Sequence, residues 1–557
     1  MAAPALSPWT PLRHKVFRWL WMASLASNIG TWFQNVGASW LMTTLSTSPA
    51  QVALVQAATS LPMFLLSLPA GALADVLDRR RILLVTQSWM ALAAAGLGIL
   101  TGTGAITPGL LLFFTFLLGL GAAVNGPAWQ SAIPEMVPRE DLPAAIALGS
   151  VGFNMARATG PALAGLVVAA AGPAVTFLFN AVSFAGVLVV LYFWKRPVEE
   201  AVLPAERILG AMTTGVRYVR HAPEVIAPIV RGSVFVLCGS SLWALLPVVA
   251  RAELKTGPAG YGLLLGALGL GAVAGAMVLP RLKRNNSTDG VVAAATLVFA
   301  GATAVLGWSR QFWVLMAAML LAGGAWLSLL SSLNVAVQTV VPSWVRARAL
   351  SVYLLVFFGG LAGGSALWGA VANQTSTSIA LYASAVGMIV GLLLTFRLHL
   401  RSGEGLNLAP SRQWPTPIVA HDLEPDRGPV MVTVQYRIDP ARGDEFHEAM
   451  RGVRRIRLRD GAMQWGLFVD SADPGLFTEM FLVKSWIEHL RQHERVTVAD
   501  QDIQARASAF HLGPDRPVVQ HLIGNSGRSS SSFQTLKPSD AEKDGTVSVL
   551  EADGFSD

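Results

Sequence analysis

The sequence predicts an all-α polytopic membrane protein of twelve transmembrane helices in two six-helix bundles, followed by a small soluble α+β domain. Of its 557 residues, 53% are hydrophobic and 13% are charged, which is unlike a soluble protein. An apolar helix needs about 20 residues to cross about 30 Å of hydrocarbon. The sequence up to residue 400 holds twelve such stretches, and the sequence beyond it has the composition of a soluble protein.

The apolar stretches fall into two groups of six, which set the expected domain organisation. They lie at about 17–44, 50–74, 82–103, 108–134, 142–168, 173–194, 225–250, 259–280, 289–308, 312–341, 349–373 and 378–397. We therefore expect an N-terminal bundle at 1–194, an inter-bundle linker at 195–224, a C-terminal bundle at 225–401, a second linker at 402–427, an α+β domain at 428–525 and a disordered tail at 526–557.

Basic residues concentrate on alternate connections between the spans, which predicts the orientation in the membrane. Cytoplasmic loops retain an excess of Lys and Arg. With the N-terminus inside, the opposite loops hold only Arg251, Lys255 and Arg310. An even number of spans then places the C-terminus in the cytoplasm too. The net charge of +7 is therefore explained by a lipid bilayer as partner, and no nucleic acid is expected.

Some function classes are disfavoured by what the sequence lacks. The single cysteine, Cys238, lies in an apolar stretch, so no intrachain disulfide can form and no cysteine-based metal cluster is expected. No GxxxxGK(S/T) loop is present, which disfavours an ATP-driven pump. We expect neither a cofactor nor a resident metal.

The two halves share a pattern at matching points. The fourth span ends in Gln130-Ser-Ala-Ile-Pro134 and the tenth in Gln338-Thr-Val-Val-Pro342, and basic residues follow each. The two glutamines lie 208 residues apart, as duplication of a six-helix unit would give. This pattern indicates a parallel repeat with a central pathway between the halves.

A short motif lies between the second and third spans. It reads Gly71-Ala-Leu-Ala-Asp75-Val-Leu-Asp78-Arg79-Arg80-Arg81. It resembles the loop signature of the major facilitator superfamily, Gly-x-x-x-Asp-(Arg/Lys)-x-Gly-(Arg/Lys)-(Arg/Lys), with Val76 and Asp78 as the two departures. The resemblance implies a gating loop, in which Gly71 permits close helix approach and Asp75 faces a helix N-terminus or basic partner in one state only. The alternative is a stop-transfer cluster that only sets topology.

The fifth span combines small residues with a buried charge. Gly160, Pro161 and Gly165 resemble the family's exporter pattern, in which small residues let helices approach and proline permits bending. Arg157 lies about 22 Å beyond the cytoplasmic start of this span. An arginine at that depth costs at least about 2.5 kcal/mol unless it faces a partner or a watery cavity. It is either an anchor for an anionic substrate or a structural tie to another helix.

Polar residues form stripes on the first and tenth spans, at helical spacing on otherwise apolar helices. In the family fold, spans one, four, seven and ten line a central cavity, so the resemblance makes these residues candidate substrate contacts. Interhelical hydrogen bonding is the alternative for any single one. The candidates are Ser24, Asn28, Thr31, Asn35, Asn125, Ser331, Asn334 and Gln338.

Carboxylates are missing from the middle of the spans. Proton-coupled transporters usually bury an acidic residue or a histidine there, whereas Asp75, Glu135, Glu140, Glu224 and Glu253 all fall near span ends. Proton coupling is therefore an expectation from the family resemblance alone.

The inter-bundle linker ends in an amphipathic pattern. Apolar residues between 206 and 220 recur on one side, with Arg207, Arg217 and Arg220 elsewhere. The pattern predicts a helix on the surface of the inner leaflet, with binding of a protein partner as the alternative.

The region after residue 427 predicts four strands and two helices in a ferredoxin-like order. It resembles the small antibiotic-biosynthesis-monooxygenase-like domains, which implies pairing as dimers. His489 and His493 lie one turn apart, but without an HExxH motif we interpret them as surface histidines on an exposed helix. We expect regulation or dimerisation here. The strands are expected at 430–438, 464–469, 476–483 and 518–523, and the helices at 444–459 and 486–509.

Over most of residues 10–400 the chain resembles bacterial major facilitator exporters of the group that includes the enterobactin exporter and the secretion effectors. The phrases SPAQVALVQAATSLPMFLLSLPAGALAD and NMARATGPALAG carry this resemblance. It implies a secondary active exporter of the bacterial inner membrane, an antiporter with protons as the coupling ion, acting on small amphiphilic or anionic molecules. We expect a transporter and not an enzyme. The alternative is a membrane-tethered enzyme or sensor whose chemistry resides in the α+β domain.

Overall fold

The computed structural model describes residues 9–194, 208–400, 406–411, 414, 424 and 426–524. The side chains of residues 72, 74–76 and 208–212 are also outside this description. The expected tail at 526–557 and most of the two expected linkers therefore lie outside the described residues.

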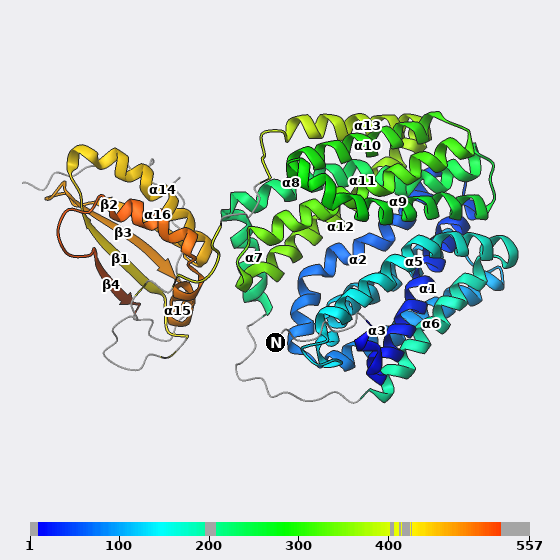
Figure 1. The fold of residues 1–557 in the computed structure, drawn as a ribbon, viewed down its shortest axis with the longest axis horizontal. Helices are drawn as coiled ribbons and strands as arrows, with labels where there is room; N and C mark the ends of the chain where they lie inside the picture. The colour runs from blue at the N-terminus through cyan, green and yellow to red at the C-terminus, as the bar shows by residue number, and fades with distance from the viewer. Residues whose placement is uncertain are drawn as a thin grey trace, which may run out of the picture.

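Within the described residues from 15 to 394, twelve long helices form two groups of six, joined by the shorter helix α7 (Figure 1). Five of them begin at a proline, whose fixed φ suits the first helical position and whose missing N–H costs nothing there. The first group is α1 Lys15–Leu45, α2 Pro49–Val76, α3 Arg79–Gly102, α4 Pro108–Ala132, α5 Leu142–Ala171 and α6 Pro173–Phe193. The second is α8 Pro223–Val248, α9 Pro258–Asn285, α10 Thr288–Trp308, α11 Phe312–Thr339, α12 Ser343–Gln374 and α13 Thr377–Leu394, with α7 at Ile208–His221.

Ten helices of the described chain are long and apolar enough to cross a membrane. The two long helices that fall short are α1 and α5. The polar stripe of α1, and Asn154 and Arg157 of α5, reduce the mean hydropathy of these two helices. The sequence predicts twelve apolar spans, whereas ten of the described helices are long and apolar enough. The other two, α1 and α5, carry polar residues along their length.

The two bundles pack against each other through α5 with α9 and α2 with α12. We call the end of the helical unit at which α1, α3 and α5 begin and α7 lies the α7 face, and the other end the opposite face (Figure 1). Along α5 and α9 the backbones nearly touch from Gly269 beside Arg157 to Gly262 beside Gly165. Along α2 and α12 the contacts run from Phe64 beside Gly359 to Ser48, which donates to Asn373 at 2.8 Å. The closest approaches therefore lie from mid-helix to the opposite face.

Helix α7 is packed between protein elements. Its Tyr218 is 2% exposed and makes an edge-to-face contact with Trp344 of α12, and its Gly215 lies against Arg348. The helix also contacts α14 of the α+β unit. The prediction that α7 lies on a leaflet surface is therefore wrong for its buried face, which α12 covers instead of lipid.

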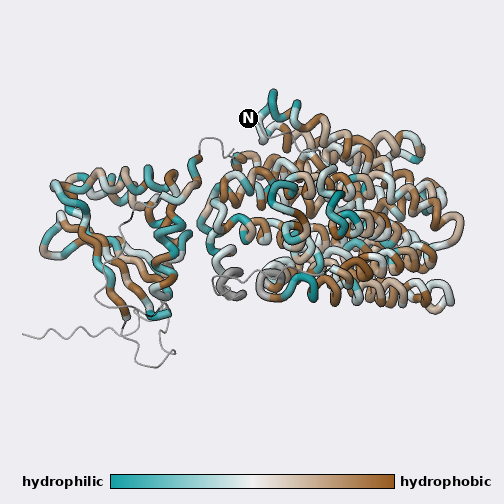
Figure 2. The backbone as a smooth tube through the Cα atoms, turned by 60° about the horizontal axis from the view of Figure 1, so that its bottom comes forward, coloured by the Kyte–Doolittle hydropathy of each residue, from teal (hydrophilic) through white to brown (hydrophobic). Residues whose placement is uncertain are grey.

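The α+β unit stands at the α7 face and is more hydrophilic than the helical unit (Figures 1 and 2). It has an antiparallel sheet of order β2-β3-β1-β4, with β1 paired to β3 and β4 on its two sides. Helices α14 and α16 cover one face of this sheet, and alternate residues of β1 and β3 are buried beneath them. The elements are β1 Val430–Arg437, α14 Gly443–Asp460, β2 Gln464–Val469, β3 Leu476–Val483, α15 Trp486–Arg495, α16 Val498–Ser508 and β4 Val518–Ile523.

The four predicted strands match these bounds within a residue, but the single helix predicted at 486–509 is two helices. Thr497 breaks the helix because its side chain accepts from the backbone N–H of Asp500, while the Asp500 carboxylate accepts from the backbone N–H of Thr497. This capping box starts a new helix and ends the old one.

Candidate functional site

A polar hollow of about 220 Å³ opens within the first bundle. Helices α1, α3, α4 and α6 supply its walls, and the α4 residues lie within two turns of the end of that helix at the α7 face. A concave site with a few convergent polar groups and an aromatic side chain is the usual form of a small-molecule site. The lining residues are Ser24, Ser27, Asn28, Gln87, Asn125, Gly126, Trp129, Gln130 and Val187.

The wall of the hollow is fixed by hydrogen bonds between α3 and α4. The Asn125 Oδ1 accepts from the Thr86 hydroxyl at 3.1 Å and from the Gln87 Nε2 at 3.2 Å. Gln87 is 3% exposed, and its Oε1 has no hydrogen-bond partner in the described part of the chain. A buried amide oxygen without a donor is costly, so a donor group that reached this acceptor would stabilise it.

The hollow brings together only some of the predicted cavity residues. Asn28 and Asn125 line it, whereas Thr31 is exposed and donates to the Ser27 carbonyl. On α11, the Gln338 amide donates to Asn334, so these two side chains bond each other. Asn35 is not among the residues that line the hollow.

Several polar residues of this region were not singled out as cavity residues from the sequence. Ser27, Gln87 and Trp129 line the hollow. Ser27 lies three residues after Ser24 and four before Thr31, so helical spacing could have found it, whereas Gln87 and Trp129 belong to no stripe. Gln34 of α1 is 5% exposed, and neither of its amide atoms has a partner among the described residues. It lies between Gly30 and Gly37, two positions where α1 meets α6 too closely for a side chain.

Arg157 of α5 is half-buried, and its side chain makes no hydrogen bond or ion pair with any residue of the described chain. Its backbone carbonyl lies against Gly269 of α9. The tie between α5 and α9 is therefore made by backbones, and no guanidinium tie to another helix is seen among the described residues. Farther along α5, Gly160 contacts the Trp32 side chain of α1. The Pro161 carbonyl and the Gly165 backbone both contact Gly262 of α9.

The predicted gating loop is held within the first bundle. The Asp78 carboxylate caps α3 by accepting from the Arg81 backbone N–H at 2.8 Å. Arg79 pairs with Glu135 at 2.5 Å, and Arg80 donates to the Leu191 and Tyr192 carbonyls at the end of α6. The loop thus fastens α3 to the ends of α4 and α6.

The roles predicted for Asp75 and Gly71 in the gating loop are not seen in the described residues. The side chain of Asp75 lies outside the described residues. Among the described atoms, a Cβ added at Gly71 would meet nothing within 4 Å. Close helix approach at Gly71 therefore stays a prediction for the state in which the α7 face is closed.

Further ion pairs secure both faces. At the α7 face, His14 and Asp141 join α1 to α5 at 2.8 Å, and Asp289 pairs with the buried Arg231. At the opposite face, Arg310 pairs with Glu253 at 2.5 Å. These pairs were not predicted, because each joins residues that lie far apart in the sequence.

The opposite face is sealed across the two bundles. Trp40 of α1 stacks on Tyr261 of α9 with ring centroids 6.1 Å apart. Arg251 donates to the Thr43 hydroxyl at 3.2 Å and lies over the Trp40 ring. Phe33, Trp40 and Val168 belong to one buried cluster with residues of the second bundle.

His489 of the α+β unit is buried and His493 is half-buried, which overturns the prediction that both lie on the surface. His489 is 1% exposed, and its ring lies 4.9 Å from that of His493 and 4.7 Å from that of His521. Burial lowers the pKa of His489 to about 3 and that of His493 to about 4. No group of three metal-ligating side chains is placed to hold a metal ion among the residues that the structure describes.

These features define a class of protein. Two six-helix groups, sealed across one face and holding a polar hollow toward the other, make a multi-pass membrane transporter of the major facilitator fold. The chain belongs to the transmembrane secretion effector family, which it matches over residues 6–529. The predicted family is thus confirmed, and its members are transporters, not enzymes.

Relatives of known name agree with this assignment. The chain is 27% identical to an enterobactin exporter of Shigella boydii over 417 residues, which cover 73% of this chain and 96% of the relative. It is 26% identical to a staphyloferrin A transporter of Staphylococcus aureus over 269 residues, which cover 48% of this chain and 67% of the relative. A solved bacterial homologue of the iron transporter ferroportin, in an inward-facing state, shares the fold with a TM-score of 0.56 at 16% identity, over 70% of this chain and 99% of that one.

Proposed function

We propose that the chain exports a small amphiphilic or anionic, siderophore-like molecule across the bacterial inner membrane by alternating access. The named relatives handle siderophores. The observation that carries the proposal for this chain is the hollow with its unpartnered Gln87 acceptor. Oxygen-rich and amide-bearing molecules offer the donors and acceptors that Gln87, Asn28 and Ser27 would bond.

All twelve long helices cross the membrane in this proposal, with α1 and α5 turning their polar residues inward. The α7 face is the cytoplasmic face, because the connections on that side carry most of the Lys and Arg. Both termini are then cytoplasmic, and so is the α+β unit. Polar residues within a membrane helix usually face a bundle interior or a watery cavity, which suits the place of Ser24, Ser27 and Asn28 at the hollow.

The conformation corresponds to the inward-facing state of the cycle. The seal formed by Trp40, Tyr261 and Arg251 closes the periplasmic side, while the hollow lies toward the cytoplasm. Substrate enters the hollow from the cytoplasm, the bundles rock about the α5–α9 and α2–α12 contacts, and the periplasmic seal opens. The gating loop then meets the second bundle through Asp75, and Arg157 attracts an anionic group of the substrate. Asn35, Asn334 and Gln338 join the pathway as the bundles move.

Protons are the proposed coupling ion. The carboxylates of the α7 face, Asp141 with His14 and Glu135 with Arg79, are paired within the first bundle, so rocking of one bundle against the other leaves both pairs in place. The proposal of protons therefore rests on the family resemblance alone.

The experiment compares accumulation of a panel of siderophores in cells that express the full chain or Gln87→Leu, with and without a protonophore. We expect the full chain to lower accumulation. Gln87→Leu should weaken substrate binding about tenfold and so lower accumulation much less, since a lost buried hydrogen bond to substrate is worth about 1–1.5 kcal/mol. Thr101→Val, which removes a hydroxyl on the same helix away from the hollow, is the matched control. Equal export by Gln87→Leu and the full chain would refute the hollow as the binding site.

The α+β unit is proposed to be a ferredoxin-like domain that pairs with a second copy. The uncovered face of its sheet is largely apolar, with Phe468 55%, Val518 54% and Leu522 47% exposed. Apolar patches of this kind mark interaction sites. We expect Leu522→Glu to lower the fraction of cross-linked dimer in membranes, and Gln520→Glu on the same strand and face to do so less. Dimer yields that are the same for both variants would contradict pairing through this face.

A further inference from the structure

The α+β unit is docked on the helical unit through two arginines that are held rigid by its own carboxylates. Arg459 donates to Asp460 and to Asp500, with four hydrogen bonds of 2.7–3.0 Å. Arg495 donates to the Asp460 backbone carbonyl at 2.7 Å and to Glu488 at 2.9 Å. Because their planes are fixed before contact, the two guanidinium groups lose little freedom on docking.

Each of these arginines lies over an aromatic ring of the helical unit. The Arg459 guanidinium is 5.5 Å from the Tyr218 ring of α7, and that of Arg495 is 4.8 Å from the Trp344 ring of α12. The two rings contact each other edge to face, with centroids 5.7 Å apart. The α+β unit therefore grips α7 and the start of α12 at the same time.

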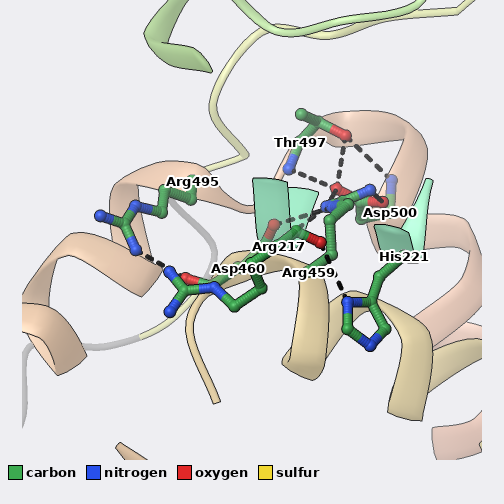
Figure 3. A network of polar contacts seen from close by, with 7 residues as sticks. All are labelled: Arg217, His221, Arg459, Asp460, Arg495, Thr497 and Asp500. Atoms are coloured by element: carbon green, nitrogen blue, oxygen red, sulfur yellow. Dashed lines mark hydrogen bonds and ion pairs between the residues drawn. The ribbon is translucent and has the colours of Figure 1, made fainter. Parts of the chain in front are cut away.

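The network around this contact is closely packed. Figure 3 shows Arg217 and His221 of α7 beside Arg459, Asp460 and Arg495. A Cβ added at Gly461 would lie 3.2 Å from Arg495 Nη1 of the same unit and 3.6 Å from Arg217 Nη2 of α7, so the two units are in close contact at Gly461. Burial lowers the pKa of Arg217, and the neighbouring Arg495 charge lowers it further.

The docked elements lie where the two bundles must move. Helix α7 follows the first bundle in the chain and contacts both α2 and α12. Rocking about the central contacts closes the α7 face by bringing the ends of α2 and α12 together, so the place of α7 on α12 must change. The α+β unit holds Tyr218 of α7 against Trp344 of α12, and it therefore opposes that change.

We propose that the α+β unit is a releasable clamp that regulates the transporter: its Arg459 and Arg495 hold α7 on α12 and so favour the state in which the α7 face is open. The inference rests on the proposed alternating-access function. Release of the clamp lets the α7 face close, and the bundles then spend more time in the other state.

The test uses the full chain in the Cys238→Ala background, with a reporter thiol from Leu77→Cys at the exposed end of α2. The rate of maleimide labelling in inside-out vesicles measures how often the α7 face is open. Tyr218→Leu removes the ring beneath Arg459, and Tyr218→Phe keeps the ring as the matched control. A desolvated cation–π contact predicts labelling about 2-fold to 30-fold slower in Tyr218→Leu than in Tyr218→Phe.

Two further measurements separate the outcomes. Hydrogen exchange of α7 reports docking itself, and we expect faster exchange in Tyr218→Leu. A thiol-specific cross-linker that spans the length of the Arg251 side chain, joined to Thr43→Cys and Arg251→Cys across the opposite face, locks the α7 face open and sets the maximal labelling rate. None of these readouts depends on the identity of the substrate.

Three results would overturn the clamp. Equal labelling and exchange in the two Tyr218 variants would refute the docking contact. Faster exchange with unchanged labelling would show docking without control of the cycle. Wild-type labelling already at the locked maximum would show that the α7 face never closes, and this result alone would overturn the proposed alternating access as well.

Discussion

Gly262→Ala is expected to open the seal at the opposite face. A Cβ at Gly262 would lie 2.5 Å from the Pro161 carbonyl oxygen and 2.8 Å from the Gly165 Cα. Both are backbone atoms, so no side chain can turn away to make room. The helices α5 and α9 must separate, and overpacking of this kind costs about 1–3 kcal/mol.

The cost falls on one state of the cycle. The contact between Gly262 and Gly165 belongs to the conformation in which the opposite face is closed, and the proposed rocking breaks it. A penalty of about 1–3 kcal/mol on that state alone shifts the ratio of the two states by about 5-fold to 150-fold, since about 1.4 kcal/mol is a factor of ten. The variant should therefore expose the opposite face without unfolding the chain.

The assay is the labelling of a thiol at Val168→Cys, again with Cys238→Ala, by an impermeant maleimide outside the cell. Val168 is 5% exposed and belongs to the sealed cluster, so its labelling should rise as the seal opens. Gly266→Ala is the control, because a Cβ there would lie 3.3 Å from the Ala162 Cβ and no closer than 3.8 Å to the backbone of α5, so a smaller shift of the helices accommodates it. If Gly262→Ala and Gly266→Ala label at the same rate, the two-glycine contact does not hold the seal.

Two further predictions concern the stability of the α+β unit in the full chain. Glu479→Ala should lower its free energy of unfolding by about 3–5 kcal/mol, because the buried Arg457 would lose its only carboxylate partner of the described chain; tryptophan fluorescence during denaturant unfolding measures this. Lowering the pH from about 6.5 to 4 should also destabilise the unit: His489 and His493 have folded pKa values of about 3 and 4, so the unfolded chain binds more protons, at a cost of up to about 1.4 kcal/mol per histidine and pH unit.

Each of these predictions has a matched comparison. Thr478→Ala lies next to Glu479 in β3 but on the other face of the sheet, and it should change stability little. A loss as large as that of Glu479→Ala would show that the strand, and not the buried charge, sets the effect. His489→Phe should flatten the pH dependence between 6.5 and 4, whereas His447→Phe at an exposed position should not; a slope unchanged in His489→Phe would contradict the assignment.

The helices and strands could be predicted because their signals are local. Apolar stretches of the right length, and the alternation in β1 and β3, show in a short window of sequence. The break before Val498 was missed because it depends on one side-chain bond, from Thr497 to the start of α16. The number of apolar spans differs from the prediction because the polar residues of α1 and α5 lower the mean hydropathy of these two helices.

The site was predicted less completely, because its members come from separate helices. Asn28 and Asn125 were found through a stripe and a family position. Gln87 is a lone amide in an apolar helix, and nothing in the surrounding sequence shows that it faces Asn125. The burial of His489 likewise depends on β4, which brings His521 beside it from more than thirty residues away.

The covalent connection between α13 and β1 changes what the docking contact has to achieve. The chain from residue 401 to 427 keeps the α+β unit near α7 at all times, and two parts joined in one chain meet at an effective concentration of about a millimolar. A contact too weak to hold two separate molecules together at micromolar concentration can therefore remain occupied in this chain. The same weakness allows it to open and re-form within each transport cycle, so the separated unit added to a truncated transporter would leave most binding sites empty.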